Sequence, residues 1–235
     1  MRQPHVLVII PCLNEQAAIG ALLKEIASCG ECYATIVVDD GSSDATYDTA
    51  VQLSPVIRLL RNLGIGGAVQ TGIKYAAAND FDFCVQIDGD GQHPPSEIAK
   101  LLNAYQQSPC SIIVGSRYLC NDSFRSSFAR RFGGQAIAWS LNTLFRRCNI
   151  SDPTSGMRLM DRHAIKFFSH SYPHDFPEPI SLAWALRQEL SVGECAVKMR
   201  SRAHGQSSIA GWKRLAYMFR VLGYVALTRL IGIRS

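Results

Sequence analysis

Two carboxylates spaced two residues apart, in the segment Asp88-Gly-Asp90-Gly-Gln92-His93-Pro94, could hold a metal ion in this 235-residue chain. They follow the apolar run Phe83–Ile87, which is typical of a buried strand, and carboxylates two apart on an extended backbone point the same way. Mg²⁺ and Mn²⁺ prefer oxygen ligands and commonly take one or two carboxylates together with phosphate oxygens. Because Asp-Gly is also a common turn signal, a pair of turn aspartates is the alternative interpretation.

A second acidic cluster, Val38-Asp39-Asp40-Gly41-Ser42-Ser43-Asp44, follows the apolar run Thr35–Val38. A carboxylate at the tip of a second strand commonly accepts hydrogen bonds from a ribose or a nucleobase. The alternative is that Ser42 or Ser43 and Asp44 cap a following helix. Both can hold together, with Asp40 on the ligand.

A glycine-rich segment, Asn62-Leu-Gly64-Ile-Gly66-Gly67-Ala68, follows the run Val56–Leu60. It is not the dinucleotide-binding fingerprint, because it follows the third strand and Val69 stands where the third glycine or alanine should be. A Walker-type phosphate loop is also excluded, since no G-K-[ST] sequence occurs. We expect the start of a helix that lies close to a ligand.

Six arginines crowd residues 117–147 with only one acid, Asp122, among them. Guanidinium groups bind phosphate in a two-pronged manner, so this segment predicts a phosphate site; a solvated basic face is the alternative. Nucleic acid is not expected as a partner, because no helix-turn-helix, zinc-finger or aromatic RNA-binding motif accompanies the arginines. The six are Arg117, Arg125, Arg130, Arg131, Arg146 and Arg147.

One further acid could act as a general base. Glu178, or Asp175 beside it, precedes the predicted helix Pro179–Leu190 and would be needed if the reacting group were a sugar hydroxyl. A favourable interaction with the helix dipole is the alternative role for an acid at this place.

The elements that must position these residues alternate between strand and helix patterns. Five apolar runs of strand type alternate with four helical patterns through residue 114, which predicts a doubly wound α/β sheet with right-handed crossovers. Ligands of such sheets lie at the carboxyl ends of the strands, where the polar clusters of this chain fall. After residue 117 the alternation ends, and we expect a helix over about 133–147, a strand at Met157–Met160, a helix at Pro179–Leu190 and a strand at Val192–Met199.

The charge pattern singles out the end of the chain. The net charge is +5, but the last acid is Glu194, so residues 1–194 carry −3 and residues 195–235 carry +8. Ile209–Ile233 places Trp212, Leu215, Phe219 and Leu222 at helical spacing among basic residues, which suits a helix in the interface of an anionic membrane. A helix packed on the domain is the alternative.

Compartment and domains are also expected from the sequence. The apolar run Val6–Ile10 is too short for a secretion signal, so a cytoplasmic protein, peripheral at the inner membrane face, with reduced cysteines is expected. We expect residues 1–208 to form one domain with two functional halves, 1–117 and 118–208. Residues 209–235 would form a basic amphipathic helical tail.

Six ordered motifs resemble family 2 glycosyltransferases with the GT-A fold, in particular the branch similar to dolichyl-phosphate-mannose synthases. The similarity covers about residues 5–208. Besides the segments around Asp40, Asn62 and Asp88, the motifs are Pro11-Cys-Leu-Asn14-Glu15, Gly115-Ser116-Arg117-Tyr118 and Asp152-Pro153-Thr154-Ser155-Gly156. Segment 121–130 departs from the usual Gly- and Trp-containing spacing.

The resemblance implies inverting, metal-dependent sugar transfer from a nucleotide-diphosphate sugar, carrying GDP or UDP, to a polyprenyl phosphate. It assigns the nucleotide to Pro11, Leu13, Glu15 and Asp40, the diphosphate and Mg²⁺ or Mn²⁺ to Asp88, Asp90 and Gln92, and the acceptor phosphate to Arg117 and Arg131. We further expect Asn14, Asp39, Asn62, Gly66 and Asp88 to bind the nucleotide-sugar and Ser155 to bind the acceptor phosphate. Residues 1–117 would then be the nucleotide-sugar half and 118–208 the acceptor half. Asp90, Arg117 and Glu178 are the expected catalytic residues.

Two other functions stay open from the sequence. The same fold could transfer to a sugar hydroxyl in polysaccharide or glycolipid synthesis, with Glu178 as the base. A non-catalytic module that binds a sugar nucleotide is disfavoured, because a binder has no need for a metal on the leaving group.

Overall fold

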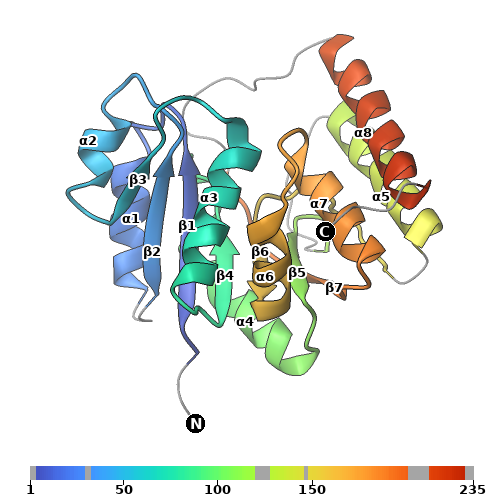
Figure 1. Ribbon diagram of the computed structural model, residues 1–235, viewed down its shortest axis with the longest axis horizontal. Helices are drawn as coiled ribbons and strands as arrows, with labels where there is room; N and C mark the ends of the chain where they lie inside the picture. The colour runs from blue at the N-terminus through green and yellow to red at the C-terminus, as the bar shows by residue number, and fades with distance from the viewer. Residues whose placement is uncertain (1–3, 30–32, 120–127, 146–147, 201–211, 231–235) are drawn as a thin grey trace.

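The computed structural model describes residues 4–29, 33–119, 128–145, 148–200 and 212–230, with 128–130 and 212–217 described as backbone only. These residues form one seven-stranded sheet in the order β3-β2-β1-β4-β6-β5-β7, flanked by helices on both faces (Figure 1). The strands are parallel except for β6, which runs antiparallel to both β4 and β5. The predicted α/β fold with a single, mostly parallel sheet is therefore confirmed.

The strands and most helices fall close to the predicted runs, but the helix at Arg162–His170 was not predicted. The strands are β1 Val6–Cys12, β2 Ala34–Asp39, β3 Val56–Arg58, β4 Phe83–Gln86, β5 Ile112–Ser116, β6 Arg158–Asp161 and β7 Val192–Ala196. The helices are α1 Ile19–Ser28, α2 Thr46–Ala50, α3 Gly64–Ala78, α4 Ile98–Gln107, α5 Phe128–Phe145, α6 Arg162–His170, α7 Pro177–Arg187 and α8 Trp212–Leu230, with a 3-10 turn at Pro95–Glu97.

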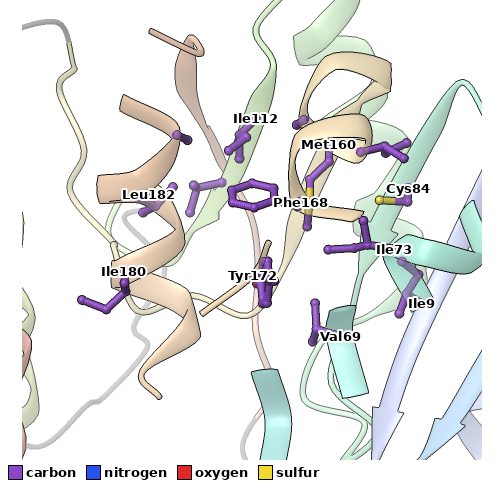
Figure 2. Packing of buried hydrophobic residues seen from close by; sticks show 14 of the residues in the cluster. Ile9, Val69, Ile73, Cys84, Ile112, Met160, Phe168, Tyr172, Ile180 and Leu182 are labelled. Carbon is purple, nitrogen blue, oxygen red and sulfur yellow. The ribbon is translucent and has the colours of Figure 1, made fainter. Parts of the chain in front are cut away.

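Alternate residues of the central strand β1 enter two different cores. Leu7 and Ile9 pack with Val69 and Ile73 of α3, on the face that α6 and α7 also cover (Figure 2). Val6, Val8 and Ile10 pack on the opposite face with α1 and α4. The continuous apolar run of β1 thus reflects a strand buried on both faces, as expected for a parallel sheet.

The serine cap predicted for the helix after β2 is wrong, whereas Oδ1 of Asp44 accepts the N–H of Thr46 at 2.9 Å. Helix α2 begins at Thr46, and no side chain caps it at Ala45. Ser42 and Ser43 are instead engaged by Asn14, which lies in the loop after β1. This contact ties the loops after β1 and β2 together at the edge of the sheet where ligands are expected.

The C-terminal helix α8 packs on the domain. Val221 and Val225 are fully buried in the core that α3, α6 and α7 share, and α8 lies beside α5 and α7 (Figure 1). The C-terminal helix is therefore packed on the domain, which was the alternative to a helix lying in a membrane interface. Several of the other side chains of α8 are exposed. The predicted boundary at 208/209, residues 121–127 of the segment 121–130, Arg146 and Arg147 lie outside the described residues.

Candidate functional site

A cavity of about 360 Å³ opens at the carboxyl ends of β1, β2 and β4. Helix α3 begins at its rim, and α7 contributes one residue from its first turn. Five carboxylates meet there: Glu15, Asp40, Asp88, Asp90 and Glu178. The rest of the lining is Pro11, Cys12, Leu13, Gly64, Ile65, Ala68 and Gly89. The topology therefore brings together residues that are up to 167 positions apart in the sequence.

The two acids at the end of β2 separate into different roles. Asp40 lines the cavity, and its Oδ1 accepts the backbone N–H of Leu63 at 2.7 Å. Burial raises the pKa of Asp40 above its ordinary range. Asp39 does not line the cavity: its Oδ1 accepts the N–H of Ser42 at 3.0 Å, and its Oδ2 lies 3.2 Å from Nε of Arg58. Asp40 thus faces the cavity, whereas Asp39 holds the turn.

The loop after β1 also divides its residues between lining and support. Pro11, Leu13 and Glu15 line the cavity. Asn14, with φ of 57°, does not line it; its Oδ1 accepts the N–H of Ser43 at 2.9 Å. Asn14 therefore supports the loop, and its contact with the nucleotide-sugar stays a prediction.

Two glycines of the glycine-rich segment stand at positions where a side chain would be unfavourable. Gly64, which lines the cavity, has φ of +79°, and the side chain of Asn62 accepts its N–H at 2.8 Å. A Cβ at Gly66 would overlap the backbone of Pro173 and His174. Asn62 and Gly66 therefore shape the site from outside the cavity lining: one orders the start of α3, and the other allows the segment before α7 to pack on it.

The predicted metal motif lies on the floor of the cavity. The side chain of Asp88 is 37% exposed, whereas Asp90 is buried and its Oδ1 accepts the N–H of Gln92 at 3.0 Å. His93 is fully buried, and its Nδ1 accepts the N–H of Asp88 at 3.2 Å. The side chain of Gln92 donates to the carbonyl of Arg200 at 3.3 Å and is not part of the cavity lining.

The donor set at this motif fits a hard divalent cation. A Cβ at Gly156 would lie 2.6 Å from Oδ1 of Asp88, so glycine there leaves room for the carboxylate. Among the described residues, no group of three or more His, Cys, Asp or Glu side chains could hold a metal by itself. Two carboxylates completed by the phosphate oxygens of a substrate is the arrangement typical of Mg²⁺. Asp88 and Asp90 therefore fit as ligands, and the role of Gln92 stays a prediction.

Arg117 is held by Asp152, which belongs to one of the six motifs but had no predicted role. Its Nε and Nη2 donate to the two carboxylate oxygens of Asp152, each at 2.6 Å, and Nη2 also reaches Oγ1 of Thr154 at 2.9 Å. Asp152 is fully buried, and its N–H donates to Glu194 of β7 at 2.8 Å. This chain of contacts fixes Arg117 at the end of β5 and raises its pKa.

None of the three residues predicted to bind the acceptor phosphate, Arg117, Arg131 and Ser155, belongs to the cavity lining. Arg131 is exposed on α5. Ser155 is buried, and its Oγ accepts the N–H of Met157 at 3.3 Å. Ser155 thus supports the turn into β6, so its predicted contact with phosphate remains untested.

Glu178 lies in the first turn of α7 with its side chain at the cavity. Burial raises the pKa of this carboxyl, and the nearby charge of Asp88 acts in the same direction. Arg158 opposes the shift. A carboxyl with a raised pKa beside a substrate cavity is suited to accept or hold a proton near neutral pH.

Arg158 is the residue that the sequence analysis missed most clearly. Its side chain is fully buried on β6, where the guanidinium donates to the carbonyls of Pro153 and Ser155 and to Oγ of Ser181. It therefore joins the 153–155 loop to α7, next to the carboxylates of the cavity. One feature of the sequence could have pointed to Arg158. It follows the motif Asp152–Gly156 by two positions and is a charged residue at the start of the apolar run that forms β6.

Comparison with known proteins agrees with this geometry. The sequence model of Glycosyl transferase family 2 matches residues 7–168. A UDP-N-acetylglucosamine–dolichyl-phosphate N-acetylglucosaminyltransferase of Methanococcus voltae is 28% identical, over 91% of this chain and 94% of that protein. A polyprenol monophosphomannose synthase of Mycolicibacterium smegmatis is 27% identical, over 92% of this chain and 84% of that protein.

A solved structure shares the fold. Glucosyl-3-phosphoglycerate synthase from Mycobacterium tuberculosis, in complex with Mn²⁺, uridine diphosphate and glucosyl-3-phosphoglycerate, superposes with a TM-score of 0.70. The two chains are 20% identical, and the match covers 99% of this chain and 81% of that one. At this identity the likeness concerns the fold alone.

Proposed function

The chain belongs to Glycosyl transferase family 2, and we propose that it transfers a sugar from a nucleotide-diphosphate sugar to a polyprenyl phosphate. The observation that carries the donor half is the cavity that collects Asp40, Asp88 and Asp90 at one edge of the sheet. The acceptor half is supported by relatives that match over nine-tenths of this chain and are named for polyprenol or dolichyl phosphate.

The donor would lie across the carboxyl ends of β1, β2 and β4. Asp40 is placed to accept hydrogen bonds from the ribose or base, with Pro11, Leu13 and Glu15 beside it. Asp88 and Asp90 would hold Mg²⁺ or Mn²⁺ against the diphosphate, where the cation would stabilise the negative charge of the leaving group. Asn14, Asp39 and His93 make hydrogen bonds within the loops that carry the donor-binding residues. These contacts would hold the donor-binding side chains in position before the substrate binds, which favours catalysis.

The reaction exchanges one bond for another. An oxygen of the acceptor phosphate attacks the anomeric carbon, the bond from that carbon to the diphosphate oxygen breaks, and the nucleotide diphosphate leaves from the opposite side. A phosphate monoester has its second pKa near about 6, so it is already an anionic nucleophile at neutral pH. The acceptor therefore needs positioning by positive charge more than it needs a base.

Arg117, fixed by Asp152, and Arg131 on α5 are the residues that we assign to this positioning. Arg131 lies in the expected acceptor half, 118–208, and Arg117 is the last residue of the expected donor half, 1–117, at the boundary between the two. The acceptor's lipid lies in a membrane, so we further assign the enzyme to the cytoplasmic face of an anionic bilayer. No helix among the described residues is long and apolar enough to cross a bilayer.

A second candidate function rests on Glu178. Its place at the cavity and its raised pKa would suit a general base for an acceptor sugar hydroxyl. The test is to offer the enzyme labelled donor with a short polyprenyl phosphate, the matching free polyprenol, or a glycan. We expect transfer to the phosphate alone. Transfer to the polyprenol or glycan, with none to the phosphate, would overturn the proposal.

A further inference from the structure

Exposed aromatic side chains gather on two neighbouring helices. Among the described residues, every exposed Phe, Tyr or Trp belongs to α5 or α8: Phe132, Trp139, Phe219 and Tyr224. Trp139 is 70% exposed and Phe219 67%. Exposed rings concentrated on one part of a surface indicate an interaction site, whereas single ones scattered over it would not.

Each helix has apolar residues on both its inner and its outer side. On α8, Val221 and Val225 enter the core, while Phe219, Leu227 and Leu230 recur at helical spacing on the other side and are exposed. On α5, Ile137 and Leu141 are buried, while Phe132 and Trp139 lie two turns apart and outward. We call the set Phe132, Trp139, Phe219, Leu227 and Leu230 the α5–α8 face.

The charges around this face have one sign. Segments 123–151 and 195–235 contain no Asp or Glu, and both helices lie within them. Arg131 and Arg220 are exposed on α5 and α8, and Nε of Arg229 donates to the carbonyl of Leu144, which joins the two helices. Aromatic and aliphatic side chains with arginine beside them match the interface of a bilayer with anionic lipids.

The face is connected to the reaction cavity through one helix. α8 packs against α7, and the rings of Tyr224 and Phe176 lie 6.4 Å apart immediately before the turn that carries Glu178 (Figure 1). We propose that the α5–α8 face lies in the interface of an anionic membrane and so presents the cavity to a lipid-borne acceptor. The presentation of the cavity to a lipid-borne acceptor rests on the proposed function, whereas binding of the α5–α8 face to a membrane does not depend on it.

A second copy of the chain fits this face poorly. Two such faces in contact would bring arginines together with no acid from either segment to pair them, and opposed like charges disfavour association. Lipid phosphates supply the missing negative charge. The absence of acids is the feature that distinguishes a lipid surface from a self-interface here.

Vesicle co-sedimentation without any acceptor tests the proposal. We compare the full chain on vesicles of phosphatidylcholine with 30% phosphatidylglycerol and on phosphatidylcholine alone, at low and high salt. The double variant W139S/F219S should bind the anionic vesicles at least tenfold more weakly, whereas L60S, at a fully exposed leucine, should bind as the parent does. R220E should weaken binding by about fivefold or more, since each basic residue near an anionic leaflet raises the affinity for it by about that factor. K24E serves as the charge-matched control.

Three outcomes would overturn the proposal: variants that bind like their controls, binding to the anionic vesicles that does not weaken in high salt, or a dimer that W139S/F219S abolishes. Transfer assays separate this failure from failure of the proposed function. With both correct, W139S/F219S keeps its activity on a short, water-soluble polyprenyl phosphate and loses it on a vesicle-embedded acceptor. A parent that binds vesicles but transfers to neither acceptor contradicts the proposed function alone.

Discussion

The guanidinium of Arg117 and the carboxylate of Asp152 form a two-pronged ion pair, with both N–O distances at 2.6 Å. Asp152 is fully buried and is itself held by Glu194 through its backbone N–H. The orientation of Arg117 is therefore set by two acids from different parts of the chain. Such fixed geometry suits a group that must meet a phosphate in one position.

Replacing Asp152 by asparagine removes the charge of this pair and should release Arg117 from its orientation. We expect the KM for polyprenyl phosphate to rise about tenfold to a hundredfold, as for loss of a charge-assisted hydrogen bond. The KM for the donor should change little. Steady-state kinetics with each substrate varied in turn measure the two values.

The matched control is Asp82→Asn, which breaks an exposed ion pair with Arg162. It should leave both KM values near those of the parent, because exposed pairs contribute little. If Asp152→Asn lowered the melting temperature and raised both KM values equally, Arg117 would have a structural role only.

Asp90→Asn should abolish transfer and the dependence of donor binding on Mg²⁺ or Mn²⁺. The asparagine keeps Oδ1, which accepts the N–H of Gln92, so we expect the melting temperature to shift by only a few degrees. Calorimetric titration of the donor with and without metal gives the measurement, and Asp48→Asn on the surface is the control. Near-parent transfer by Asp90→Asn would remove Asp90 from the metal site.

Glu178→Gln distinguishes the two acceptor classes. If the acceptor is a phosphate, the variant should keep its rate within about tenfold, because an anionic nucleophile needs no base. If the acceptor is a sugar hydroxyl, loss of a general base should cost about 10²–10⁴ in kcat. Single-turnover rates decide between these outcomes.

The same variant carries a pH dependence of stability. Burial raises the folded-state pKa of Glu178 above its ordinary 4.5, so the folded state holds the proton more tightly. Its contribution to the free energy of unfolding is present below pH 4.5 and is lost as the pH rises through the folded-state pKa. Glu178→Gln should therefore melt above the parent at neutral pH, with the difference disappearing toward pH 4. A constant difference across this range would contradict the raised pKa.

Gly66→Ala should destabilise the fold and weaken the donor site together, because its Cβ would overlap backbone rather than a movable side chain. Gly223→Ala is the matched control: a Cβ there meets nothing within 4 Å on the exposed side of α8. Alanine is the better helix former by about 0.5–1 kcal/mol, so the control should be neutral or stabilising. Thermal melts and donor affinities compare the two; equal melting temperatures would show that the close approach at Gly66 is not required.

Much of the fold could be predicted from local patterns. The strands β1, β2 and β4 are buried on both faces of the sheet. A strand buried in this way needs apolar residues at consecutive positions, and such continuous runs can be seen in the sequence. The antiparallel insertion of β6 between β4 and β5 could not be predicted, because pairing of distant strands leaves no local signal. The polar ends of β1, β2 and β4 meet at one cavity as expected, since parallel strands end at the same edge.

The sequence could not predict which residue of each motif lines the cavity and which one supports a loop. Asp39 and Asp40 are adjacent acids, yet one holds a turn and the other lines the cavity, because neighbouring side chains of an extended chain point to opposite sides. Asp152 and Glu194 act through contacts with residues far along the chain, and Arg158 joins the loop just before it to Ser181 of α7. A buried charge of this kind is recognised only when its partners are placed.

Product analysis with an ¹⁸O-labelled acceptor shows whether an oxygen of the acceptor phosphate forms the new bond to the sugar. The enzyme is incubated with GDP- and UDP-sugars, Mg²⁺ or Mn²⁺, and a short polyprenyl phosphate whose phosphate oxygens carry ¹⁸O, and all products are weighed by mass spectrometry. We predict a lipid that gains one sugar and keeps its single phosphate with all of the label, together with an unlabelled nucleoside diphosphate. A lipid with two phosphates and a released nucleoside monophosphate, or donor hydrolysis with no lipid product, would contradict the account.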